Sequence, residues 1–134
     1  MLNIIVIDGD GYRADMIEYM LTSMVECNIK MCTTKVGGLK AININYNKNQ
    51  LDLILICPYV PVYWRHADVA YCIESMHLEM ERLGINVPIC VYGANADVVP
   101  KNYYTYKLNF TEDEEELRNQ LLPILNEIRN KDNA

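Results

Sequence analysis

Three side chains capable of chemistry stand directly after two apolar runs of the chain. Asp8 and Asp10 follow the run 4–7, and Cys57 follows the run 53–56. Paired carboxylates can bind Mg²⁺ or take part in phosphoryl transfer, and a thiolate is a soft nucleophile. Apolar runs of this length are typical of buried parallel strands, and functional residues of open α/β sheets lie at the carboxyl ends of such strands. We therefore expect both groups to open into one crevice.

The loop Asp8-Gly9-Asp10-Gly11 resembles the first motif of haloacid-dehalogenase-type phosphatases. In that motif the first Asp is the nucleophile and the second is the general acid/base. This resemblance implies a Mg²⁺-dependent phosphatase that uses Asp8 and Asp10 as an alternative function. However, Tyr12 stands in place of the motif's threonine, and Tyr92 stands where a second Ser or Thr is expected. A loop that needs Asp and Gly for its turn geometry is the simpler interpretation, so we expect no enzyme.

Hydrophobic periodicity predicts that strands and helices alternate along the chain. The expected strands cover residues 4–7, 28–34, 51–57, 87–92 and 103–108. The expected helices cover residues 12–27, 39–46, a segment through 69–83, and a C-terminal segment capped by Thr111 that contains Pro123. With right-handed crossovers, this alternation predicts a flavodoxin-like, doubly wound five-stranded parallel sheet of order 2-1-3-4-5. No antiparallel strand and no cap domain are expected.

The third helix is expected to be unusually long. Apolar residues recur through it at steps of three and four, and a glycine follows: Val69, Ile73, Met76, Met80, Leu83 and Gly84. The gap 94–102 contains a proline and leaves little room for another helix, so the fourth helix should be short or absent. We expect residues 1–130 to form a single domain and residues 131–134 a polar tail.

The segment from Asp52 to Pro61 resembles the third strand of response-regulator receiver domains, in which an Asp, four apolar residues and the phosphorylated Asp precede a proline. Here Cys57 occupies the acceptor position. Receivers also carry two adjacent acids after strand 1, and these bind Mg²⁺ together with the acceptor. Asp8 matches the first acid, and Arg13 and Leu21 behind it also fit the resemblance.

The remaining receiver positions are altered. Gly9 occupies the place of the second acid, and Asp10 is an acid one residue later. Tyr92 replaces the Thr or Ser that ends strand 4, and the lysine of strand 5 falls near Lys107. Mg²⁺ prefers oxygen ligands, and phosphoryl transfer to a receiver needs a carboxylate nucleophile. The resemblance thus implies a degenerate pseudo-receiver with no metal, no cofactor and no phosphorylation in the usual manner.

Composition restricts the classes of partner and compartment. The chain has 134 residues, of which 51% are hydrophobic and 22% charged, and its net charge is −6. These values are typical of a soluble globular protein and argue against a nucleic-acid surface. No apolar run is long enough to span a membrane, and no leader is expected at the N-terminus. Five cysteines without a CxxC pair favour reduced thiols in the cytoplasm.

Aromatic residues provide candidate contact sites. Tyr59, Tyr63 and Trp64 follow the third strand, and Tyr104 begins the last one. Tyr and Trp are enriched at protein interfaces. Receivers signal through protein contacts, so we expect a stand-alone, phosphorylation-independent interaction module that binds a protein partner or a second copy of itself. The apolar stripe of the long third helix is a second candidate surface, and a small-molecule sensor in the vacated crevice is a further alternative.

Overall fold

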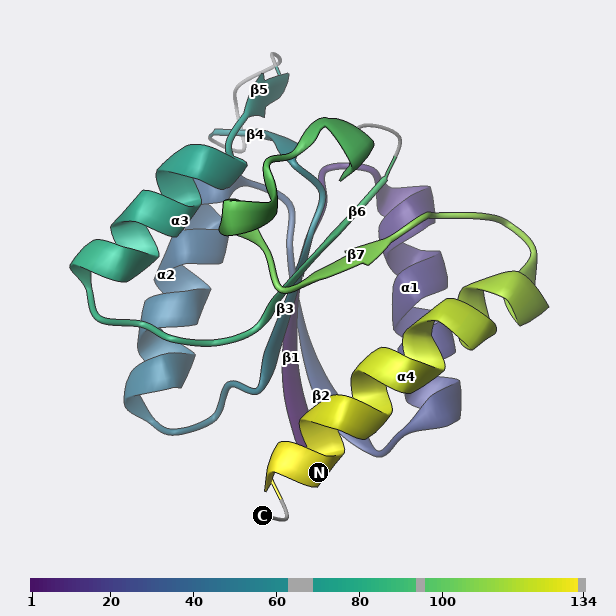
Figure 1. The fold of residues 1–134 in the computed structure, drawn as a ribbon. Coiled ribbons are helices and arrows are strands. Elements are labelled where there is room, and N and C mark those ends of the chain that lie inside the picture. The colour runs from purple at the N-terminus through teal and green to yellow at the C-terminus, as the bar shows by residue number, and fades with distance from the viewer. Residues whose placement is uncertain (63–68, 94–95, 133–134) are drawn as a thin grey trace.

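In the computed structural model, which describes residues 1–62, 69–93 and 96–132, five parallel strands form one central sheet (Figure 1). Its order, β2-β1-β3-β6-β7, confirms the predicted 2-1-3-4-5 topology. The pairing is parallel throughout this sheet. The strands are β1 (Leu2–Ile7), β2 (Cys27–Cys32), β3 (Leu53–Ile56), β6 (Ile89–Tyr92) and β7 (Tyr106–Leu108).

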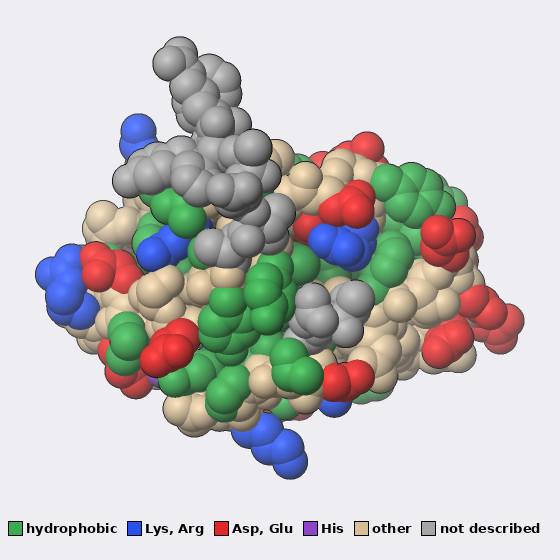
Figure 2. Space-filling view, turned by 90° about the horizontal axis from the view of Figure 1, so that it is seen from above, with side chains coloured by type: hydrophobic (Ala, Val, Ile, Leu, Met, Phe, Trp, Pro, Cys, Tyr) green, Lys and Arg blue, Asp and Glu red, His purple; other side chains and the backbone are tan. Residues whose placement is uncertain are grey.

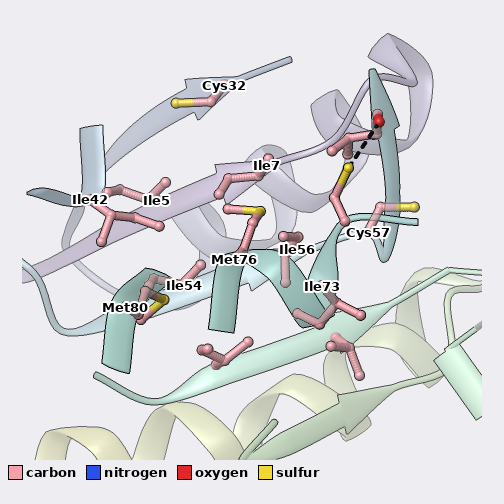
Figure 3. Close-up of a cluster of buried hydrophobic side chains, with 14 of the residues drawn as sticks. Ile5, Ile7, Cys32, Ile42, Ile54, Ile56, Cys57, Ile73, Met76 and Met80 are labelled. Atoms are coloured by element: carbon pink, nitrogen blue, oxygen red, sulfur yellow. Dashed lines mark hydrogen bonds between the residues drawn. The ribbon is translucent and has the colours of Figure 1, made fainter. Parts of the chain in front are cut away.

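Two helices cover each face of the sheet (Figure 1). On one face lie α1 (Gly11–Met24) and α4 (Glu114–Asp132), and on the other lie α2 (Lys35–Asn47) and α3 (Ile73–Arg82). Successive strand residues point to opposite faces of the sheet, so each apolar run contributes side chains to two separate cores. Figure 3 shows the core under α2 and α3, where side chains of β1 and β3 meet Met76 and Met80 of α3. No helix among the described residues is long and apolar enough to cross a membrane.

The prediction of a long third helix is wrong. Val69–Tyr71 forms strand β5, which pairs antiparallel with β4 (Tyr59–Pro61) in a two-stranded sheet separate from the main one. The expectation of no antiparallel strand is therefore also wrong for this hairpin. A residue whose backbone pairs with β4 cannot also be helical, so α3 begins only at Ile73 and has 10 residues.

The end of α3 follows the glycine signal in the sequence. Gly84 adopts a positive φ of 71°, and the Ile85 N–H donates to the carbonyl of Met80 at 2.9 Å. This is the Schellman arrangement, in which glycine follows the helix in a left-handed conformation. Leu83, expected on the buried stripe, is 41% exposed. The apolar face of α3 is thus reduced to Ile73, Met76 and Met80.

Other boundaries differ by a few residues. Asp113, not Thr111, caps α4, because its Oδ1 accepts from the N–H groups of Glu115 and Glu116. Thr111 Oγ1 instead accepts from the Asp113 N–H. The helix α4 also extends through Asp132, into the expected tail.

The predicted loss of the fourth helix agrees with the described residues between β6 and β7. They contain two three-residue 3₁₀ helices, η1 (Ala96–Val98) and η2 (Lys101–Tyr103). Ala96 and Val99 are buried, and Tyr103 and Tyr104 pack against the same core cluster as α3. This irregular segment therefore covers part of the sheet next to β7.

Candidate functional site

The carboxyl ends of β1, β3 and β6 bring together the residues that the sequence singled out. Asp8 follows β1, Cys57 follows β3, and Tyr92 is the last residue of β6. The side chain of Arg13, from the first turn of α1, reaches into the same place and contacts both Asp8 and Cys57. We call these four residues the Asp8 cluster.

Asp8 is the centre of this cluster. Its side chain is 0% exposed, and its two carboxylate oxygens accept four hydrogen bonds. Arg13 donates from Nε to Oδ2 at 2.7 Å and from Nη2 to Oδ1 at 2.8 Å. The Asp10 N–H donates to Oδ1 at 2.9 Å, and the Tyr92 hydroxyl donates to Oδ2 at 2.7 Å. An ionised carboxylate offers about four lone-pair positions, so this one is saturated.

The donors around Asp8 keep their protons. The hydrogen bond to Asp8 raises the pKa of Arg13 further above its usual range, so the guanidinium stays charged. Burial, followed by the charge of Asp8, raises the pKa of Tyr92 far above its usual range. Tyr92 therefore remains a neutral hydroxyl that donates to the carboxylate. A fork-shaped Arg–carboxylate pair with an added phenol donor is a strong and directional arrangement.

Cys57, which directly follows β3, is a buried thiol. It is 6% exposed, and Arg13 Nη2 lies 3.4 Å from its Sγ. Burial raises the pKa of Cys57, although a backbone hydrogen bond at Tyr59 and the charge of Arg13 act in the opposite direction. A thiol in this environment is protonated at neutral pH, and the protonated form is neither a good nucleophile nor a metal ligand.

The two loop positions that could supply further acids are used structurally. A Cβ at Gly9 would lie 2.8 Å from Cδ of Pro61, a distance that real Cβ atoms do not show. The ring of Pro61 in β4 thus leaves no room for a second acid at position 9. Asp10 caps α1 through its Oδ1, which accepts from the Arg13 N–H at 3.1 Å.

Lys107 does not join the Asp8 cluster. Its Nζ donates to Asp97 at 2.6 Å, and both side chains are exposed. The cation that contacts Asp8 and Cys57 is Arg13, from α1. In the sequence, only the resemblance to receiver domains points to Arg13. The physical sign was the apolar setting of Asp8, because a buried carboxylate needs a charged partner.

This donor set does not fit the Mg²⁺ ion of receiver domains. The Asp8 oxygens are already engaged, position 57 offers sulfur instead of oxygen, and position 9 offers no side chain. Among the described residues, no group of three or more His, Cys, Asp and Glu side chains could hold a metal ion.

The aromatic candidates fall into two parts. Tyr59 packs against Tyr71 across the β4–β5 hairpin, with ring centroids 5.3 Å apart. Tyr104 lines a cavity of about 400 Å³ between α3 and η2, together with His77 and Tyr103, whose rings are also 5.3 Å apart. Tyr63 and Trp64 lie outside the described residues.

An electrostatic contact connects these two parts. The pKa of Tyr71 is raised by burial and then by its neighbours Tyr103 and Tyr59. Tyr71 therefore lies near both Tyr59 and Tyr103. We call this set the aromatic strip: Tyr59, Tyr71, Tyr103, His77 and Tyr104. The sequence indicated Tyr59 and Tyr104 but not Tyr71 or His77, because both of these lie in the segment that was expected to form one long helix.

Comparison with known proteins places this geometry in context. No protein-family model matches the chain, and no curated protein sequence matches it. Among solved structures, a response regulator receiver domain protein from Clostridium thermocellum superposes with a TM-score of 0.64 at 15% identity, covering 96% of this chain and 98% of that one. This chain has a receiver-like fold.

Two further structures have the same likeness. The signal receiver domain of an HD domain-containing protein from Pseudomonas fluorescens Pf-5 gives a TM-score of 0.63 at 10% identity, covering 96% of this chain and 98% of that one. The anti-anti-sigma factor PhyR from Bartonella quintana gives 0.60 at 15% identity, covering 98% of this chain and 51% of PhyR. The receiver-like fold is thus shared with these structures at only 10–15% sequence identity.

Proposed function

We propose that this receiver-like domain is a pseudo-receiver, a cytoplasmic signalling module that binds a protein partner without being phosphorylated. The observation that carries the proposal is the saturated carboxylate of Asp8. A receiver that responds to phosphorylation needs free carboxylate oxygens for Mg²⁺ and a carboxylate nucleophile. Here the first are occupied, and the second is replaced by the protonated thiol of Cys57.

The aromatic strip supports protein binding as the remaining role. Tyrosine and histidine rings offer rigid contact area together with polar groups, a combination that is enriched at interfaces. The cavity beside Tyr104 has the size of a pocket for an anchoring side chain or a small ligand. Figure 2, which looks down on the carboxyl edge, shows hydrophobic side chains gathered at the centre of that face. The five cysteines are thiols and not disulfides, which suits a reducing compartment.

Phosphorylation is tested directly. Purified protein is incubated with Mg²⁺ and either acetyl phosphate or beryllofluoride, and the mass and the thermal unfolding temperature are measured. We expect no added phosphoryl group and no shift of the unfolding temperature. Formation of an acyl phosphate in the wild-type chain would refute the proposal.

The phosphatase alternative is separated in the same samples. A generic phosphatase substrate should not be turned over, because the oxygens of Asp8 are engaged by Arg13 and Tyr92. Turnover of this substrate by the wild-type chain that disappears in Asp8→Asn would support the phosphatase hypothesis instead.

Partner binding is tested by affinity capture from the native cell and by light scattering on the purified chain. We expect stoichiometric recovery of a protein or a stable homodimer, weakened by Tyr104→Ala, Tyr63→Ala or Trp64→Ala. Tyr19→Ala is the matched control, since Tyr19 is 57% exposed on α1, on the opposite face of the sheet. A monomer that captures no protein but co-purifies with a metabolite would favour the small-molecule sensor.

A further inference from the structure

We propose that the guanidinium of Arg13 takes the place that Mg²⁺ has in receiver domains. It would thereby hold the residues at the carboxyl ends of β1, β3 and β6 in one fixed arrangement. The inference rests on the proposed function and deepens it. It concerns what keeps the Asp8 cluster together when neither Mg²⁺ nor a phosphoryl group is used.

The contacts of Arg13 are those expected of such a cation. The guanidinium lies between the carboxylate of Asp8, at 2.7 and 2.8 Å, and Sγ of Cys57, at 3.4 Å. Its Nη1 is also 3.9 Å from Oδ2 of Asp10. One side chain therefore contacts the residue that matches the first acid of receivers, the acidic residue nearby, and the residue at the acceptor position.

The Arg13–Asp8 pair fixes the orientation of its two side chains more strictly than a bound Mg²⁺ ion would. A guanidinium bonded through two nitrogens to one carboxylate requires a particular orientation of both groups, whereas Mg²⁺ exchanges with water. Because Arg13 is part of α1, the charge cannot dissociate. Tyr92, which donates to the same carboxylate at 2.7 Å, ties the end of β6 to the arrangement.

The burial of the cluster makes the charge necessary. The Asp8 side chain is 0% exposed and that of Arg13 is 21% exposed. Removing the partner of a buried carboxylate leaves an uncompensated charge, and its cost is large compared with that of an exposed ion pair. The exposed pair between Arg82 and Glu79 on α3 provides that comparison within the same chain.

The first test is chemical rescue. Thermal unfolding of Arg13→Ala is followed with and without tens of millimolar methylguanidinium chloride, and with sodium chloride at the same concentration. We expect the unfolding temperature to fall by roughly 10 °C. Methylguanidinium, but not sodium, should restore part of that loss, because a ligand that binds only the folded state stabilises it.

Arg82→Ala serves as the control and should show neither the fall nor the rescue. If Arg13→Ala is unfolded, refolding by methylguanidinium is scored by circular dichroism instead. Equal responses to methylguanidinium and sodium, or no loss of stability, would overturn the proposal.

The second test restores a carboxylate at the acceptor position. In Cys57→Asp the new carboxylate would lie beside Arg13 and be paired by it, so Mg²⁺ should not raise the unfolding temperature. In Arg13→Met/Cys57→Asp the carboxylates at positions 8 and 57 lose this partner, so Mg²⁺ should raise the unfolding temperature or refold the protein.

A Mg²⁺ response in Cys57→Asp alone, or none in the double variant, would show that Arg13 does not hold the cation position. Neither test uses a phosphoryl donor or a partner protein. Failure of this inference is therefore distinct from failure of the proposed function, which is judged on the wild-type chain.

Discussion

A carboxylate removed from water needs compensating donors, and at Asp8 these come from three places along the chain. The Asp10 N–H is local, Arg13 comes from α1, and Tyr92 comes from the far end of β6. The network joins segments 84 residues apart in sequence. The ring of Tyr92 is fully buried. Its hydroxyl donates to Asp8 and keeps its proton, because its pKa is raised far above the usual range.

Tyr92→Phe isolates that hydroxyl, because the ring and its packing are retained. The variant leaves one lone pair of a buried, charged acceptor without a donor, and we expect a loss of about 1–3 kcal/mol in the free energy of unfolding. Urea denaturation measures this value. Tyr12→Phe, at a residue that is 63% exposed, should change stability by less than ~0.5 kcal/mol. Equal values for the two variants would mean that the Tyr92–Asp8 bond contributes nothing.

The strands were the elements most readily predicted from the sequence. Runs such as Leu53–Ile56 are buried on both faces, and continuous apolar residues are the direct signature of that environment. The predicted start of the third helix is wrong because Val69 lies four residues before Ile73, a spacing that fits a helix. The backbone of Val69 instead pairs with β4. Periodicity within one segment carries no information about a pairing partner that is itself only three residues long.

The candidate site was predicted only in part for a similar reason. Asp8, Cys57 and Tyr92 directly follow or end strands, so topology alone placed them at one edge. Arg13 reaches this edge through a long side chain from α1, and Lys107 turns away to Asp97. Such choices depend on side-chain orientation and local charge, which residue spacing does not determine.

The hairpin made by β4 and β5 explains why position 9 is a glycine. Gly9→Ala would place its Cβ 2.8 Å from the rigid ring of Pro61, and overpacking of this kind costs about 1–3 kcal/mol. Denaturant unfolding of Gly9→Ala, Pro61→Ala and the double variant gives the coupling between them. We expect the double variant to recover stability relative to the sum of the single changes. Gly11→Ala, whose Cβ would meet nothing within 4 Å, is the control and should be neutral or stabilising. Additive losses would exclude the steric explanation.

At the scale of the whole molecule, fold and site chemistry are separable. Structures that are only 10–15% identical to this chain share its fold, because a fold depends on the pattern of buried strands and covering helices more than on individual residues. Both cores are built mainly from aliphatic side chains, and two residues of the Asp8 cluster, Cys57 and Tyr92, also belong to them. The sheet therefore depends on apolar packing, and the hydrogen bonds of Asp8 add polar contacts at its carboxyl edge.

The same buried interior makes the molecule sensitive to alkaline pH. Burial raises the pKa of Cys90 from its ordinary value of 9.0 to about 12, and the pKa of Cys57 and that of Tyr92 are raised as well. Above about pH 9 the unfolded chain loses these protons while the folded chain keeps them. The unfolded state then binds fewer protons, so the free energy of unfolding decreases as pH rises. This stabilisation is complete below pH 9 and is lost progressively towards pH 12.

The free energy of unfolding, measured in urea over this pH range, should fall as pH rises. The fall should be shallower in Cys90→Ala than in Cys27→Ala, because Cys27 is only partly buried. Equal slopes in the two variants would show that the Cys90 thiol does not contribute.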